Sequence, residues 1–97
     1  MKQISIGSEI KSCCPQLRLG CIEADVVVAG PSAGFLHEMD ARVQQLAQSL
    51  SIESISKIPA IAASRKGYKA CGKDPARYRL SAEALLRRVV SGKGLYQ

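Results

Sequence analysis

The first thirty residues place their apolar positions in ways that are typical of β-strands. Lys2 to Gly7 alternates polar and apolar residues, with its two isoleucines on the same side, which predicts a short, half-buried strand. A second strand is expected from about Leu17 to Ala29. Its end, Val26-Val27-Val28, is β-branched on both faces, as in the central strands of sheets. Between the two strands, Lys11 to Gln16 contains Cys-Cys-Pro and predicts a turn.

From residue 32 onward the apolar spacing becomes helical. Ser32 can cap a helix that begins at Ala33. One apolar face of this helix, at spacings of three and four, consists of Leu36, Met39, Val43, Leu46 and Leu50. Ile52, Ile55 and Ile58 keep the same period, so the pattern leaves open either a second short helix or a continuation of the first.

Two further helices follow. Pro59 suits the first position of a helix, where its missing N–H would lack a partner anyway, and Gly72 suits the end of that helix. Asp74-Pro75 then initiates a tight turn. Ser81 can cap a last helix, from Ala82 to about Val90, and Gly92 and Gly94 end it. Strands first and helices after predict one α+β domain over residues 1–97, with short N-terminal strands in a mostly antiparallel sheet followed by three or four helices.

Two strands make a poor sheet, because a two-stranded hairpin is marginal in water and leaves its edges open. We therefore expect an incomplete domain: either the front part of a longer domain or a chain that completes its sheet through a partner. Association of identical copies through the open edges is one way to do so.

Composition narrows the class of protein. No apolar run approaches the roughly 20 residues that span a bilayer, and the N-terminus has no apolar signal-peptide core. The cysteines form no CxxC pair, so we expect no metal site and no cofactor. We expect a cytoplasmic protein with reduced thiols, no contact with membranes, and Cys21 and Cys71 as small core residues.

Positive charge is concentrated in the last third of the chain. Residues 1–64 carry five Lys and Arg against six acids, whereas residues 65–97 carry nine against two, a net charge of +7. We call Arg65–Lys93 the basic unit, a helix–loop–helix whose cations can form a phosphate-binding surface. The candidate RNA-binding residues are Arg65, Lys66, Lys69, Arg77, Arg79, Arg87 and Arg88. One alternative is a solvated surface that keeps the protein soluble, and Arg65, Arg79 or Arg88 could instead form a buried salt bridge. The loop from Gly72 to Leu80 is longer than the three or four residues of a typical DNA-binding helix-turn-helix.

Three other patterns can be interpreted as chemistry, and each has a simpler explanation. A cysteine could pair with His37 as nucleophile and base, but such sites are defined by a geometry that the sequence does not show. Glu23 and Asp25 lie on one face of the predicted strand, which is also how the polar face of a half-exposed strand looks. Gly30 to Gly34 precedes a helix, as phosphate-binding loops do, but lacks the glycine spacing and the Lys-Ser/Thr ending of those motifs.

The order of residues in the basic unit resembles a known family. The matching elements are Tyr68-Lys69-Ala70-x-Gly72, Asp74-Pro75, Tyr78-Arg79 and Ser81-x-x-Ala84-Leu85-Leu86, preceded by Ile58-Pro59. In this order they resemble the tRNA-binding and editing module of the phenylalanyl-tRNA synthetase β subunit, its third and fourth domains, and most closely its free-standing bacterial form. The resemblance covers residues 17–97 and is strongest over residues 58–96.

The resemblance implies an aminoacyl-tRNA-related module, with tRNA or aminoacyl-tRNA as partner. A complete module of this kind would hydrolyse mischarged tRNA. Within this chain the matched residues imply structural roles, held by Tyr68, Gly72, Asp74, Pro75, Ser81 and Leu85. The family usually carries proline where this chain has Leu80. Its editing-pocket residues follow the matched part, so we assign no catalytic residue and expect no enzymatic activity from the 97 residues alone. The alternatives are a non-catalytic protein that binds RNA or a small ligand, and a structural fragment without independent activity.

Overall fold

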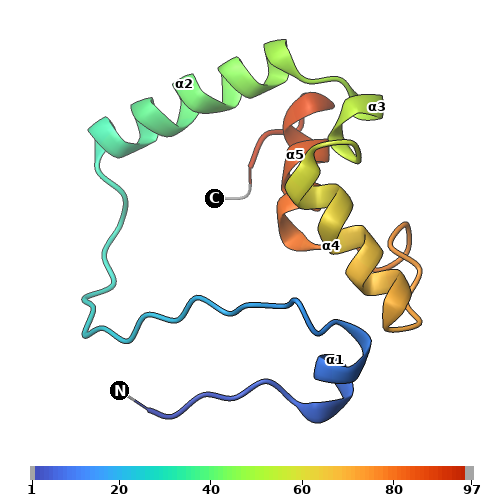
Figure 1. Ribbon diagram of the computed structural model, residues 1–97. Helices are drawn as coiled ribbons and strands as arrows, with labels where there is room; N and C mark the ends of the chain where they lie inside the picture. Colours follow the sequence, from blue (N-terminus) through green and yellow to red (C-terminus); the bar gives the residue numbers. More distant parts are fainter. Residues whose placement is uncertain (1, 96–97) are drawn as a thin grey trace.

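The computed structural model describes residues 2–95, which form five helices and no strand. In chain order the helices are α1 (Ser8–Cys13), α2 (Ala33–Ser49), α3 (Ile52–Ile55), α4 (Pro59–Ala70) and α5 (Ser81–Val90). Figure 1 shows α3, α4 and α5 grouped together, with α2 reaching away from them and the N-terminal third forming a separate extended run. The predicted α+β fold with an antiparallel sheet is therefore wrong for the described residues, which are helical.

The two segments predicted as strands are extended but do not pair. Residues 2–7 and 17–29 have no regular structure, and the Lys2 backbone N–H donates to the Glu23 carboxylate at 2.8 Å instead of to another backbone. Val27 and Val28 are more than 90% exposed, as is Ile22. A β-branched run favours extended backbone, but a strand also needs a neighbouring backbone that accepts and donates its hydrogen bonds. Residues 2–95 supply no such neighbour.

Helix α1 occupies part of the stretch that was predicted as a turn. Its hydrogen bonds begin at Gly7, whose carbonyl accepts from Lys11 at 3.0 Å, and they end at Cys14, which donates to Ile10 at 2.7 Å. Glu9 lies in its first turn, where a carboxylate interacts favourably with the free N–H groups. The residue after Cys14 is proline, which cannot continue the helix. None of the residues of α1 is buried.

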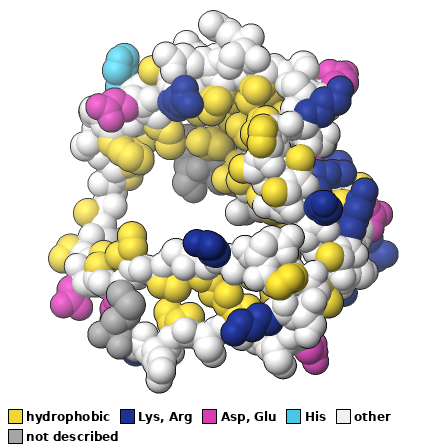
Figure 2. Space-filling model, in the orientation of Figure 1, with side chains coloured by type: hydrophobic (Ala, Val, Ile, Leu, Met, Phe, Trp, Pro, Cys, Tyr) yellow, Lys and Arg dark blue, Asp and Glu magenta, His cyan; other side chains and the backbone are white. Residues whose placement is uncertain are grey.

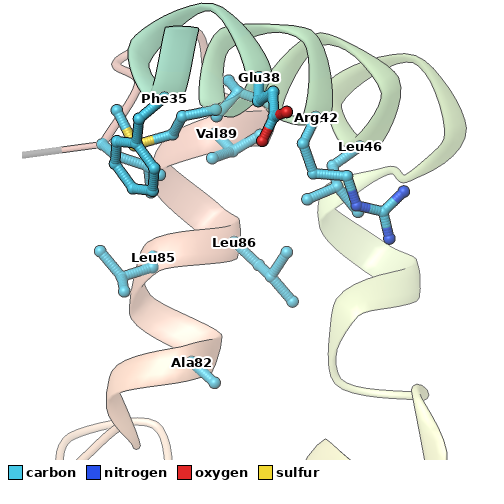
Figure 3. Close-up of a pocket in the computed structure, with 11 residues that line it drawn as sticks. Phe35, Glu38, Arg42, Leu46, Ala82, Leu85, Leu86 and Val89 are labelled. Carbon is cyan, nitrogen blue, oxygen red and sulfur yellow. The ribbon is translucent and has the colours of Figure 1, made fainter. Parts of the chain in front are cut away.

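Helix α2 follows its prediction closely. The Ser32 hydroxyl accepts from the Phe35 N–H at 3.1 Å, so the predicted cap is confirmed. Met39, Val43 and Leu46 of its apolar face are half-buried. They line a groove of about 490 Å³ against α5, to which Leu85 and Leu86 also contribute. Figure 3 shows Phe35 and Leu46 below α2, with Leu85 and Leu86 projecting from α5.

The core lies where α5 packs against α2 and α3. Its buried apolar side chains are Ile55 of α3, Ile61 of α4 and Val89 of α5. The isoleucine spacing left open either a second short helix or a continuation of α2. The structure has a second short helix, α3, because Leu50 ends α2 with extended backbone. Cys21 and Cys71 were expected in the core, and both are exposed.

The ends of α4 and α5 use the same glycine motif. Gly72 has φ +78°, and its N–H donates to Lys69 at 3.0 Å, while Lys73 donates to Tyr68 at 2.9 Å. Gly92 and Lys93 repeat these bonds to Val89 and Arg88. The left-handed backbone costs glycine little, and the pair of bonds satisfies carbonyls that the helix leaves free. Glycine was therefore a correct marker of both helix ends.

The loop between α4 and α5 is held by Asp74. Its Oδ1 accepts from the Ala76 N–H at 3.0 Å, and its carbonyl accepts from Tyr78 at 2.8 Å, which confirms the predicted turn. Pro75 in the same turn is buried. Ser81 was expected to cap α5, but it is the first helical residue, and Leu80 occupies the cap position without a side-chain hydrogen bond. The cap prediction for Ser81 is therefore wrong by one residue.

The described residues have an open arrangement. The radius of gyration is 16.6 Å, against about 13 Å for a compact domain of this length. The accessible surface is 8074 Å², against about 5,400 Å² for a compact monomer of this size. Figure 2 shows the cause: much of the extended N-terminal third lies across an opening from the α3–α5 core, and it approaches α4 near α1.

Candidate nucleic-acid interface

One buried carboxylate organises the centre of the basic unit. Glu83, in the first turn of α5, is 0% exposed and accepts from Arg65 of α4 at 3.0 and 2.9 Å. It also accepts from Arg87 Nε at 3.0 Å, one helical turn further along α5. Arg65 lies 3.5 Å from the Pro75 carbonyl as well, which ties α4 to the loop. The two arginines are each less than a quarter exposed.

The charge on Glu83 is maintained by these arginines. Burial by itself raises the pKa of Glu83, but hydrogen bonds from Arg65 and Arg87, together with their positive charges, outweigh it. The pKa therefore lies below the ordinary value of 4.5, and Glu83 is ionised at neutral pH. Arg65 and Arg87 were candidate RNA-binding residues, and the structure gives both of them an internal partner.

Arg88 is also held by the protein. Its Nε donates to the Gly94 carbonyl at 3.0 Å and its NH2 lies 3.4 Å from the Lys93 carbonyl, so it fixes the chain that follows α5. Arg79 is different, since its Nε is 4.0 Å from Glu83 and its side chain is 41% exposed. Arg79 is thus the most exposed of the three arginines that pair with Glu83, and it makes the longest of these contacts.

The remaining cations of α4 and its following loop are exposed together. We define the basic surface as Lys66, Lys69, Lys73, Arg77 and Arg79, all exposed. Figure 2 shows Lys and Arg side chains gathered on the side of the molecule that α4 and the loop form. Four of the seven candidate RNA-binding residues belong to this surface, and Lys73 joins them.

An exposed tyrosine lies within the basic surface. Tyr78 is 46% exposed, with Lys73 Nζ at 5.2 Å and Arg77 Cζ at 5.6 Å from its ring centroid. Both distances fall within the range of cation–π attraction. The ring therefore places two cations of the loop beside one exposed aromatic side chain.

Two features of this region were not among the predicted site residues. Glu83 could have been found from spacing, because it lies four residues after Arg79 and four before Arg87 on a helix. The pairing of Tyr78 with Lys73 could not, because it depends on the fold of the loop. Tyr68, a predicted structural residue, is half-buried and lines a second cavity of about 510 Å³, which lies between α1 and α4.

The alternative chemistry receives no support from the geometry. Among residues 2–95 no three His, Cys, Asp or Glu side chains converge in a way that could hold a metal ion. Glu23 accepts from the backbone of Lys2, and His37 is exposed on α2. None of the helices in the described part of the chain is both long and apolar enough to cross a bilayer.

Comparison with known proteins found no matching family model, no similar curated protein and no similar solved structure. The likeness to the synthetase module therefore stands on the motif order alone.

Proposed function

We propose that this protein is a non-catalytic RNA-binding module that binds phosphates through the basic surface. The observation that carries the proposal is the position of Lys73 and Arg77 against the exposed Tyr78 ring. Three further exposed cations lie on α4 and in the loop that follows it: Lys66, Lys69 and Arg79. Cations that are already ordered lose less conformational freedom when they meet a phosphate. Their number gives affinity without sequence specificity.

Burial of Glu83 supports this division of roles. Glu83, the acid of α5, is buried and pairs at 2.9 Å with Arg65 and Arg87, whereas among the residues of the basic surface its ion pair is the longer one to Arg79, at 4.0 Å. Asp74 is the other acid of the basic unit, and its Oδ1 is turned to the backbone of its own loop. The five cations of the basic surface are thus exposed together with one exposed acid, Asp74.

The motif order suggests that the bound RNA is a tRNA. Because tRNA is used in the cytoplasm, we also propose a cytoplasmic location for the protein. A longer native form could also carry the editing activity that the resemblance implies. A deacylation assay on phenylalanine tRNA charged with tyrosine tests that part of the proposal. Hydrolysis by the chain would contradict the non-catalytic assignment while leaving RNA binding in place.

Fluorescence anisotropy with labelled tRNA tests RNA binding at several salt concentrations. We expect the logarithm of the affinity to fall linearly with the logarithm of the salt concentration, because counterions are released from the RNA. The double variant Lys73→Ala/Arg77→Ala should weaken binding about tenfold at low salt and reduce the salt slope by about one to two.

Matched variants distinguish an effect of the basic surface from an effect of net charge alone. Arg42→Ala/Lys57→Ala removes two exposed cations outside the basic surface and should leave the affinity almost unchanged. Tyr78→Ala should weaken binding about two- to fivefold through loss of the two cation–π contacts, whereas Tyr78→Phe keeps the ring and should not. Equal losses in both double variants, or no tRNA binding at low salt, would refute the proposal.

A further inference from the structure

The two cavities described above are similar in size but differ in the charges of their lining residues. The groove between α2 and α5, of about 490 Å³, has one acid and one base in its lining, Glu38 and Arg42. The cavity between α1 and α4, of about 510 Å³, is lined by Arg18 and Lys73 and by no acid. We call it the α1–α4 cavity. Both volumes lie within the range of small-molecule sites, but the α1–α4 cavity is the one whose positive charge is not balanced.

The walls of the α1–α4 cavity come from parts of the chain that are far apart in the sequence. Ile10 of α1 and Leu17 contribute to one side, and Ala63 of α4 to the other. Figure 1 shows α1 next to the C-terminal end of α4. The two sides meet at Cys14, because a Cβ atom added at Gly67 of α4 would lie 3.3 Å from its Sγ atom. The fold therefore creates this cavity, and no local motif predicts it.

The lining of the α1–α4 cavity is mostly apolar. In addition to the aliphatic side chains, it contains the ring of Tyr68 and the thiols of Cys14 and Cys71, which behave as small apolar groups. Ile10 is 47% exposed and Leu17 is 39% exposed, so both present apolar area that a ligand would cover. An apolar body of a small molecule is thus favoured inside the cavity.

The two cations of the cavity have no acidic partner. Within residues 2–95, neither Arg18 nor Lys73 forms an ion pair. Lys73 also lies over the Tyr78 ring at 5.2 Å and so belongs to the basic surface as well, whereas Arg18 lies outside that surface. A guanidinium binds a carboxylate through two parallel hydrogen bonds. An unpaired arginine beside an apolar cavity therefore favours a ligand with a carboxylate at one end of an apolar body.

We propose that the α1–α4 cavity binds an apolar carboxylate, with its apolar body between the two helices and its carboxylate against Arg18 and Lys73. Such a ligand also adds contacts that fix α1, which buries none of its own residues. The site differs from the basic surface in its apolar walls and in Arg18. Because Lys73 belongs to both, Arg18 is the residue that tests this site alone.

The test is a titration of the full chain with decanoate, below the concentration at which decanoate forms micelles, followed by ¹H–¹⁵N NMR. We expect saturable shifts of the amide signals of residues 10–18 and 63–73, with a Kd of about 1 mM or lower. The amide signals of α2 should not shift. Decanol has the same chain without the charge, and it should bind about fivefold more weakly or worse, because it makes no ion pair.

Three variants distinguish the cavity from general attraction of an anion to a basic protein. Arg18→Glu should weaken decanoate binding about fivefold or more, because it replaces attraction with repulsion. Arg42→Glu changes the net charge of the chain by the same amount and should leave binding unchanged. Ala63→Phe places a ring in the cavity from an exposed position of α4 and should prevent binding. Helix circular dichroism should be the same in all three.

Several results would overturn the proposal. They are an absence of saturable shifts, shifts centred on the groove between α2 and α5, equal affinity for decanol and decanoate, equal losses in Arg18→Glu and Arg42→Glu, or normal binding by Ala63→Phe. Failure of tRNA binding would leave decanoate binding intact, because Arg18 and the apolar walls lie outside the basic surface. The two proposals therefore fail separately.

Discussion

At the scale of single residues, Glu83 shows how a basic segment is divided between structure and surface. Its carboxylate is completely buried and forms ion pairs with Arg65 and Arg87, so these two arginines are bound within the protein and not to RNA. A buried charge of this kind is tolerated because both oxygens are hydrogen-bonded. If one charged member of this cluster were removed, the remaining charges would stay buried without a counter-charge. The resulting loss of folding free energy is larger than the net stabilisation that the intact cluster provides.

Glu83→Gln should lower the free energy of unfolding by about 3 kcal/mol at neutral pH, because it leaves two half-buried guanidinium groups without a counter-charge. Urea unfolding followed by helix circular dichroism measures this change. Glu53→Gln, which neutralises an exposed glutamate of α3, is the matched control and should change stability little. A neutral effect of both substitutions would show that the cluster does not stabilise the fold.

The same residue sets a dependence of stability on pH. The pKa of Glu83 is lowered in the folded protein, so its contribution is fully present above the ordinary value of 4.5. It is lost as the pH falls through the lower folded pKa, because the unfolded chain then binds more protons. Urea unfolding in steps from neutral pH down to about pH 3 should show this loss in the wild type and much less of it in Glu83→Gln. Parallel curves for the two proteins would contradict the assignment.

At the scale of elements, the C-terminal ends of α4 and α5 are defined by backbone hydrogen bonds around a glycine. Gly72 and Gly92 end α4 and α5 with the same pair of hydrogen bonds. The start of α5 is less well defined, because Leu80 occupies the cap position and makes no side-chain hydrogen bond. Its φ of −65° is the angle that a proline ring imposes.

Leu80→Pro should therefore stabilise the protein by about 0.4 to 1 kcal/mol, because it restricts the unfolded chain without changing the folded backbone. The thermal midpoint, followed by circular dichroism, checks this. Leu80→Ala is the control: it removes the half-buried side chain without fixing φ and should be destabilising. A lower midpoint for the proline variant than for the alanine variant would show that the backbone at residue 80 does not tolerate the ring.

At the scale of the whole molecule, the N-terminal third is exposed to an unusual degree for an apolar sequence. Ile22, Val27 and Val28 are each more than 90% exposed, and the backbone of residues 17–29 forms no strand pairing with the rest of residues 2–95. Free backbone donors and acceptors beside apolar side chains are a template for pairing with another chain. We therefore expect copies of this protein to associate through residues 17–29.

Light scattering coupled to size-exclusion chromatography, over a range of protein concentrations, tests the expected association. Val27→Lys should shift the protein toward the monomer, because a charged side chain disfavours pairing of an exposed segment. Gln48→Lys adds the same charge to an exposed position of α2 and should leave association unchanged. A monomer at every concentration would contradict the expectation.

The sequence by itself determined the features that depend on neighbouring residues. Five local features were predicted correctly: the serine cap at Ser32, the proline at the start of α4, the turn at Asp74 and the two glycine helix ends. Each arises from contacts within a few positions. The apolar face of α2 was predicted correctly except at Leu36, which is 40% exposed. The short helix α1 was missed, since a six-residue helix without a buried face has no apolar period to detect.

Only the tertiary structure decided features that depend on distant partners. A β-branched run predicts extended backbone, but whether residues 17–29 form a strand depends on a second backbone that lies elsewhere, and residues 2–95 do not provide one. The basic unit shows the same limit. Its net charge was visible in the sequence, yet burial of Glu83 determines that Arg65 and Arg87 serve the core, while Lys73 and Arg77 remain exposed around Tyr78. The sequence gives the charge of each side chain, but packing in the folded chain decides whether that side chain is buried or exposed to solvent.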